Sequence, residues 1–79
     1  MLLPREQSPW NCGYYLGAIA LRALRDSAGG KLDLPNLQRH MSLLAARAIS
    51  STQVVMAASW LFLLGAVQLD ADGAIALCD

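Results

Sequence analysis

The sequence predicts a mainly α-helical fold with a C-terminal β-hairpin, in the order of a winged-helix-like domain. Three stretches repeat apolar residues at helical spacing, and a Gly-Gly pair and a Ser-x-x-Gln signature separate them. After the third stretch, two short alternating segments flank an Asp-Gly turn, which is a strong hairpin signal. We expect residues 1–79 to form one such domain, because a chain of 79 residues has room for only one small core.

The first twelve residues contain Pro4 and Pro9, and proline is unfavourable inside a helix. We therefore expect residues 1–12 to form an extended arm that precedes the first helix. The apolar side chains of this arm are Leu2, Leu3 and Trp10.

The first predicted helix starts near Gly13 and ends before Gly29, where the Gly-Gly pair breaks the pattern. Its apolar stripe consists of Leu16, Ile19, Ala20, Ala23 and Leu24. The second predicted helix has Asp33 as its N-cap and Pro35 in its first turn. Its stripe consists of Leu37, Met41, Leu44 and Ala48. The pattern leaves open whether this helix is interrupted near Ser42.

The third predicted helix begins at a capping box formed by Ser50 and Gln53 and stops at Gly65. It is apolar nearly all round. One face consists of Val54, Ala57, Ala58, Leu61 and Phe62. The other consists of Met56, Trp60, Leu63 and Leu64. Trp60 and Phe62, taken singly, could each fill the core, but a three-helix domain can cover only one of the two faces completely.

The predicted hairpin follows directly. Residues 67–69 and 74–77 are its strands, and residues 70–73 form the turn. Asp70 and Asp72 are interpreted as turn formers that bond their own backbone, not as ligands of a calcium loop.

The chain has more apolar side chains than a small domain can bury. Hydrophobic residues make up 56% of it and charged residues 15%, whereas an ordinary soluble domain has roughly 25% charged residues. Large exposed apolar patches usually mark binding sites for other proteins. We therefore predict a protein-binding function. The candidate interface residues are Leu2, Leu3, Trp10, Tyr14, Tyr15, Met56, Trp60 and Leu63.

A winged-helix-like fold also suggests DNA binding through its third helix. Arg47 is the last basic residue, so the third helix and the hairpin have no cation for phosphate contacts, which supply most of the affinity for DNA. A DNA-binding regulator or antitoxin-like repressor is thus the alternative. Its basic patch would consist of Arg22, Arg25, Lys31, Arg39 and Arg47. These cations are explained more simply as ordinary solvent-exposed residues on the outer sides of the helices than as a DNA-binding patch.

Cys12, followed by Gly13 at the start of a helix, resembles the nucleophile of a cysteine hydrolase, and Gln7 could imitate an oxyanion donor. His40 is the only histidine, and nothing in the sequence orients it as a base. We expect no catalytic residue: Cys12 is interpreted as an ordinary thiol and His40 as a surface residue of the second helix.

Metal, cofactor and membrane sites are not expected either. Two distant cysteines, Cys12 and Cys78, and one histidine lack the paired spacing of a zinc site. The longest apolar run, residues 54–67, is shorter than the ~20 residues needed to span a bilayer. The N-terminus lacks the basic and apolar regions of a secretory signal, so we expect a cytoplasmic chain with reduced thiols.

Three short segments resemble the small middle components of bacterial ABC-three-component systems. They are Met-Leu-Leu-Pro at residues 1–4, Leu-Gly at 16–17, and residues 60–69 leading to Asp-Gly at 72–73. The similarity covers nearly the whole chain. The resemblance implies a gene product made beside an SMC-like ABC ATPase and a variable effector, often a nuclease or hydrolase, in defence against phage and plasmids. It further implies a non-catalytic adaptor that bridges the ATPase and the effector or holds the effector inactive.

Overall fold

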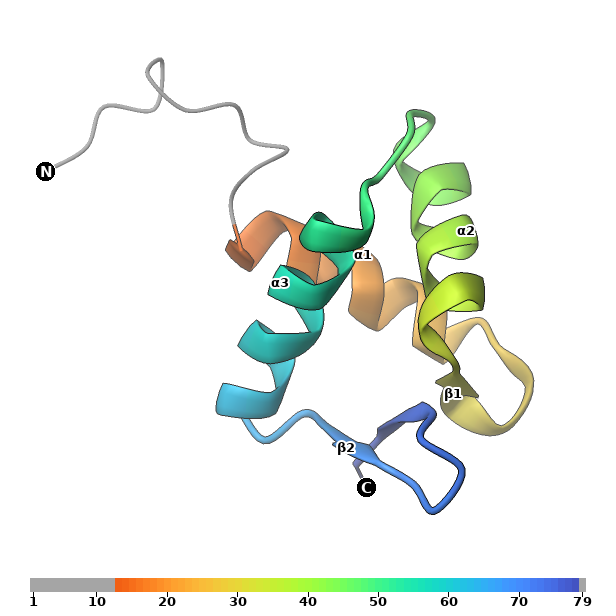
Figure 1. Cartoon of the computed structure of the whole chain (residues 1–79), viewed down its shortest axis with the longest axis vertical. Helices are drawn as coiled ribbons and strands as arrows, with labels where there is room; N and C mark the ends of the chain where they lie inside the picture. Colours follow the sequence, from red (N-terminus) through yellow and green to blue (C-terminus); the bar gives the residue numbers. More distant parts are fainter. Residues whose placement is uncertain (1–12, 79) are drawn as a thin grey trace, which may run out of the picture.

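The computed structural model describes residues 13–78, and the predicted N-terminal arm lies outside this range. Within it, three α-helices lie together and a small antiparallel sheet lies at one end of them (Figure 1). The elements in chain order are α1 (Gly13–Arg25), η3 (Ala28–Gly30), β1 (Lys31–Leu32), α2 (Leu34–Ala45), α3 (Ser51–Leu63), β2 (Val67–Leu69) and β3 (Ile75–Leu77). The order of three helices followed by a strand pair confirms the predicted fold class and is consistent with a winged-helix-like arrangement.

The hydrophobic core lies between the three helices and the sheet. Every α-helix contributes to it, as do β2 and β3. The buried residues are Leu16, Ala20, Ala23, Leu24, Leu37, Met41, Ile49, Val54, Ala57, Ala58, Leu61, Val67 and Ile75. No polar or charged residue of the described chain is buried with them, so apolar burial is the main stabilising contribution in this interior.

The apolar stripe predicted for α1 is the side of this helix that faces the core. Four of its five members are buried, and only Ile19 is half-buried at the edge. α1 ends at Arg25, before the Gly-Gly pair, as the sequence predicts.

α2 begins as predicted, because the Asp33 side chain accepts a hydrogen bond from the Asn36 N–H at 2.9 Å. Its predicted end is wrong. The helix stops at Ala45, and Ala46 adopts the left-handed conformation with φ 57°, which turns the chain away from the helix axis. Ala48 therefore lies outside the helix and is exposed, and Ile49 enters the core instead.

The helix is not interrupted at Ser42. The Ser42 hydroxyl donates to the Gln38 carbonyl and accepts the Ile49 N–H, at 2.9 and 3.0 Å. Gln38 in turn donates from Nε2 to the Ile49 carbonyl at 2.8 Å. Both backbone groups of Ile49 are thus bonded to α2, which holds its side chain in the core.

α3 starts at the predicted capping box: the Ser50 hydroxyl accepts the Gln53 N–H, and the Gln53 side chain accepts the Ser50 N–H. Four members of the first predicted apolar face are buried, and Phe62, whose place in the core the sequence left open, is 38% exposed. The buried stripe runs from Val54 to Leu61, and Phe62 lies about a quarter of a turn from its centre.

The sheet contains the predicted hairpin and one strand that the sequence did not predict. β3 lies in the middle and pairs antiparallel with β2 and with β1, in the order β1-β3-β2. The Asp70 carboxylate forms the turn by accepting the Asp72 and Ala74 N–H groups at 2.9 and 3.0 Å. Gly73 completes the turn with φ 82°, a conformation that favours glycine.

Candidate protein interaction face

Three large side chains predicted at the interface lie on one side of α3, and a fourth, Tyr14, is exposed at the neighbouring end of α1. Met56, Trp60 and Leu63 follow i, i+4, i+7 spacing and form one stripe along α3. The N-terminal end of α1, which carries Tyr14, packs beside this stripe: a Cβ on Gly13 would lie 3.9 Å from Met56 Cγ. We call these four residues the α1/α3 face. Their exposed fractions are 72% for Tyr14, 39% for Met56, 37% for Trp60 and 83% for Leu63.

Glycine at position 17 allows the two helices to approach under this face. A Cβ on Gly17 would lie only 2.8 Å from Trp60 Cδ1 and 3.6 Å from Leu61 Cδ2. The five-membered ring of Trp60 therefore packs against α1 at Gly17, while the side chain as a whole remains 37% exposed. A half-covered Trp is held in one position and still offers a large apolar surface.

The other predicted interface residues are not part of this group. Leu2, Leu3 and Trp10 precede Gly13 in the chain and fall outside the described residues. Tyr15 is half-buried, and it points about 100° around α1 from Tyr14. It therefore belongs to the side of α1 that faces α2, not to the α1/α3 face.

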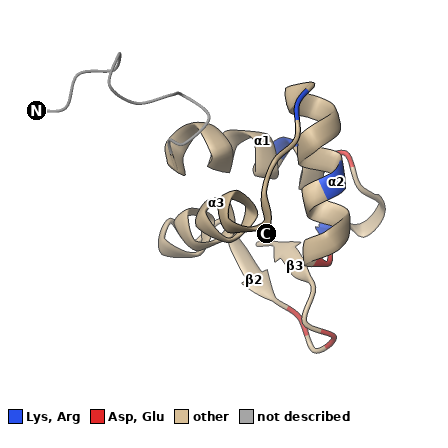
Figure 2. Cartoon of the chain, turned by 45° about the horizontal axis from the view of Figure 1, so that its top comes forward, with Lys and Arg blue, Asp and Glu red and all other residues tan. Residues whose placement is uncertain are grey.

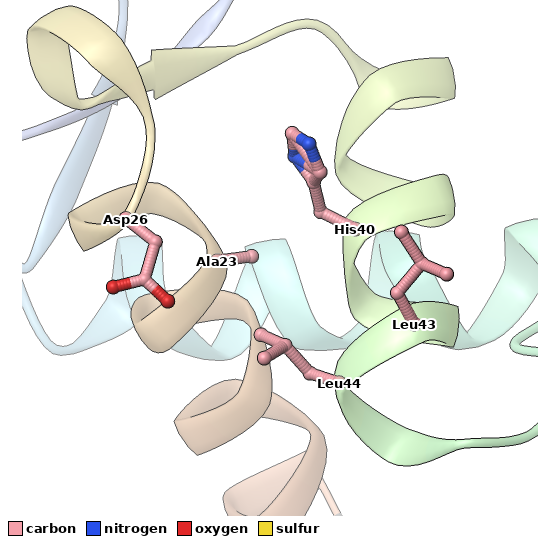
Figure 3. A pocket seen from close by; sticks show the side chains of 5 residues that line it. All are labelled: Ala23, Asp26, His40, Leu43 and Leu44. Atoms are coloured by element: carbon pink, nitrogen blue, oxygen red, sulfur yellow. The ribbon is translucent and has the colours of Figure 1, made fainter.

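A second partly apolar surface, between α1 and α2, was not predicted from the sequence. Leu43 is 72% exposed and Leu44 is 43% exposed, and both line a hollow that also includes His40 (Figure 3). Leu44 belongs to the predicted apolar stripe of the second helix, and its placement on the buried side is wrong. The sequence signal for this surface is the Leu43-Leu44 pair, which extends the apolar side of α2 beyond the buried Leu37 and Met41.

His40 was predicted to be a surface residue, and the structure corrects this. The side chain is half-buried, and its Nδ1 atom is buried without a hydrogen-bond partner in the described part of the chain. It lies between α2 and the C-terminal end of α1, where the packing of the two helices covers one edge of the imidazole.

The basic residues of the described chain all precede α3. Lysine and arginine lie on α1, β1, α2 and the segment after α2, whereas α3 and the strands β2 and β3 contain none (Figure 2). The β2–β3 turn is acidic, with Asp70 and Asp72. The α1/α3 face itself has no charged residue.

One ion pair connects the two halves. Lys31 Nζ lies 2.9 Å from Asp70 Oδ2. The hydrogen bond from Lys31, followed by that from the Ala74 N–H, lowers the pKa of the Asp70 carboxyl. The hydrogen bond to Asp70 and the negative charge of Asp70 raise the pKa of Lys31. The pair ties β1 to the turn at the far end of the hairpin.

The two cysteines do not form part of a catalytic or metal-binding cluster among the described residues. Cys12 lies outside the described residues, and Cys78 is exposed with a free thiol. Within residues 13–78, no three His, Cys, Asp or Glu side chains come together in a way that could hold a metal ion. No helix in this range is long and apolar enough to cross a membrane.

Comparison with known families decides the assignment. The family model of the ABC-three component (ABC-3C) system Middle Component 6 matches residues 3–78. The chain belongs to this family. The resemblance seen in the sequence is thereby confirmed. A middle component is one part of a multi-component system, which implies protein partners. No curated protein and no solved structure matches the chain.

Proposed function

We propose that this middle component is a non-catalytic adaptor that binds other proteins of its system through the α1/α3 face. The observation that supports the proposal is the gathering of four large uncharged side chains, 37–83% exposed, on two packed helices. A contiguous apolar patch is costly to leave in water, and binding a partner removes that cost.

The composition of the face suits a binding site. Trp60 and Tyr14 are of the residue types most enriched among interface hot spots. Covering a large apolar side chain contributes about 1.5–3 kcal/mol. Trp60 packs against Gly17, so its side chain is already held in place before a partner binds. Leu63 is 83% exposed, so its side chain can adjust to the surface of the partner.

Residues 1–12 are proposed to extend this interface. They join α1 at Gly13, which lies beside Met56 at the edge of the α1/α3 face. The apolar side chains that this segment would add are Leu2, Leu3 and Trp10. Together with the helical domain they would form one unit of 79 residues that binds its partner with both parts.

The partners proposed are an SMC-like ABC ATPase and an effector subunit, in a cytoplasmic complex that acts against phage or plasmids. The family assignment supports a role beside an ATPase component. An adaptor that joins them needs no catalytic residue or cofactor of its own. Its contribution is to position the effector relative to the ATPase.

Co-expression with the other two components tests the proposal. Leu63→Asp places a charge in the α1/α3 face, and because Leu63 is 83% exposed the fold should be unaffected. We expect at least a tenfold loss of copurifying partner. Leu69→Asp is the matched control, since Leu69 is 59% exposed on β2, outside the face, and we expect it to retain the partner. Equal recovery of partner with both variants would contradict the proposal.

DNA binding by α3 is the alternative function, and the charge distribution weighs against it. Neither α3 nor the strands β2 and β3 carry a cation, and α3 exposes Val55, Phe62 and Leu63 to solvent. Phosphate contacts could come only from the α1, β1 and α2 half of the described chain. Retardation of a DNA fragment at low salt by the isolated protein would favour this alternative.

A further inference from the structure

The surface between α1 and α2 contains a groove that the proposed function does not use. One hollow of about 160 Å³ is lined by Ala23, Asp26, His40, Leu43 and Leu44 (Figure 3). A second hollow of about 240 Å³ is lined by Ala18, Ile19, Arg22 and Leu44. Because both include Leu44, they adjoin along the line where the two helices meet. We call them together the α1–α2 groove.

Most of the groove lies away from the contact between α1 and α3. Gly17 faces Trp60 of α3, whereas Ile19 and Arg22 line the groove beside α2. With about 100° per residue, Ile19 is displaced from Gly17 by about 200° around the helix axis. Ala18, which lines the second hollow, follows Tyr14 by four residues, so the two surfaces adjoin on that side of α1. The first hollow, which contains Leu43 and Leu44 of α2, lies away from the α3 stripe of Met56, Trp60 and Leu63.

The groove has apolar walls and one polar atom without a partner. Leu43 and Leu44 are 72% and 43% exposed. Covering either side chain with an apolar partner would lower the free energy of the complex. His40 Nδ1 is buried and unpaired among the described residues, so it is not open to an occupant of the groove. The exposed surface offered to a partner is that of the two leucines.

The two helices that form the groove are positively charged. α1 and α2 contain Arg22, Arg25 and Arg39 and no acidic residue within their bounds. Asp26, just after α1, is paired with Arg22 at 3.1 Å, and both side chains are more than half exposed. Arg39 precedes Leu43 by one helical turn. Asp26 lines the first hollow and neutralises Arg22, whereas Arg39 has no carboxylate partner among the described residues, so the surface keeps a net positive charge beside Leu43.

We propose that the α1–α2 groove binds an acidic amphipathic helix of a second partner subunit. The inference extends the proposed function, because an adaptor that bridges two proteins needs two separate surfaces. The occupant would place apolar side chains over Leu43 and Leu44 and carboxylates toward Arg22 and Arg39. A helix fits between two helices by ridge-into-groove packing and completes a bundle.

The same observations favour this occupant over others. A nucleic acid on this surface would place charged phosphates against the apolar side chain of Leu43, which is unfavourable because the phosphates would lose water there. Residues 1–12 of the chain are a poor helix because of Pro4 and Pro9. A second copy of the described domain would bring another basic α1 and α2 surface against this one.

Photo-crosslinking in the co-expressed three-component complex tests the inference. Leu43→p-benzoylphenylalanine probes the groove, and Leu63→p-benzoylphenylalanine, at a similarly exposed leucine, probes the α1/α3 face. We expect position 43 to crosslink to an acidic helical segment of one component, identified by mass spectrometry, and position 63 to crosslink to the other component. The double charge reversal Arg22→Glu with Arg39→Glu should reduce the first crosslink at least tenfold and leave the second unchanged.

The two proposals fail in different ways in this experiment. A crosslink from position 43 only to a second copy, to residues 1–12 or to nucleic acid, or no crosslink at all, overturns the groove assignment. If position 63 still reaches a partner in that case, the proposed adaptor function stands. If position 63 reaches no other component, the α1/α3 face is not the adaptor's interface.

Discussion

Gly17 of α1 and Trp60 of α3 are in direct contact, so that a Cβ on the glycine would lie 2.8 Å from Trp60 Cδ1. Real Cβ atoms do not approach this closely, and a larger residue at position 17 must displace the indole. The contact couples the position of the largest side chain of the α1/α3 face to the packing of the two helices.

Gly17→Ala should destabilise the protein by about 1 kcal/mol, since overpacking costs about 1–3 kcal/mol and the better helix propensity of alanine returns about 1 kcal/mol. Urea unfolding measures the change, and the Trp60 indole N–H signal in an NMR spectrum should shift. In a Trp60→Ala background the clash is absent, so the same substitution should stabilise. A destabilisation of equal size in both backgrounds would show that Trp60 is not the obstacle.

Leu61 and Leu63 are two residues apart on α3 but differ in exposure, 3% against 83%. Leu61→Ala should lower the free energy of unfolding by about 2–5 kcal/mol, because it removes buried methyl groups and leaves a cavity. Leu63→Ala should change it by less than about 0.5 kcal/mol. Comparable losses in urea unfolding would mean that the isolated protein buries Leu63.

Ala46 ends α2 in the left-handed conformation, with φ 57° and ψ 34°. Glycine adopts this conformation without a steric penalty, so Ala46→Gly should raise the free energy of unfolding by about 0.5–1 kcal/mol. Ala45→Gly is the control, because position 45 is helical and glycine there should destabilise by a similar amount. Loss of stability in both variants would argue against the left-handed cap.

The Lys31–Asp70 ion pair should make stability depend on pH at both extremes. The pKa of Asp70 is lowered in the folded state, so its contribution is present above the ordinary value of 3.8 and is lost as pH falls through the lowered pKa. The pKa of Lys31 is raised, so its contribution is present below 10.5 and is lost as pH rises through the raised pKa.

Asp70→Asn tests this dependence, because an asparagine oxygen can still accept the two backbone N–H groups of the turn. At neutral pH the variant should have a lower Tm than the wild type, and the difference should vanish well below pH 3.8. Asp72→Asn controls for net charge. A Tm difference that persists unchanged in strong acid would assign the effect to the turn and not to the ion pair.

The elements predicted from the sequence are those with local signals. α1 and α3 have apolar stripes at helical spacing, α3 has a capping box, and the Asp-Gly turn marks the hairpin. β1 has only two residues, Lys31 and Leu32, and its partners Ala76 and Ile75 are far along the chain. No local pattern marks such a strand, because its pairing depends on where α1 places the chain.

The end of α2 was mispredicted for a related reason. Alanine is the best helix former, yet Ala46 takes a left-handed conformation, with its N–H and the Arg47 N–H bonded back to the Leu43 and Ser42 carbonyls. The residue type at position 46 therefore does not predict the end of the helix. Because the apolar spacing continues to Ala48, the sequence predicted a longer helix, but Ile49 and not Ala48 is buried in the core.

The candidate faces were predictable only in part. Helical spacing places Met56, Trp60 and Leu63 on one stripe, but the addition of Tyr14 and the separation of Tyr15 depend on how α1 packs on α3. The α1–α2 groove depends on the same kind of packing. A stripe pattern identifies which side of each helix is apolar, but not which helices meet or what remains open between them.

The order of the strands has a consequence for synthesis. Among the described strands, the central one, β3, is made last, and both of its neighbours pair with it alone. A nascent chain that has not yet reached Ile75 can therefore assemble its helices but must leave two strand edges unpaired and Val67 uncovered on one side.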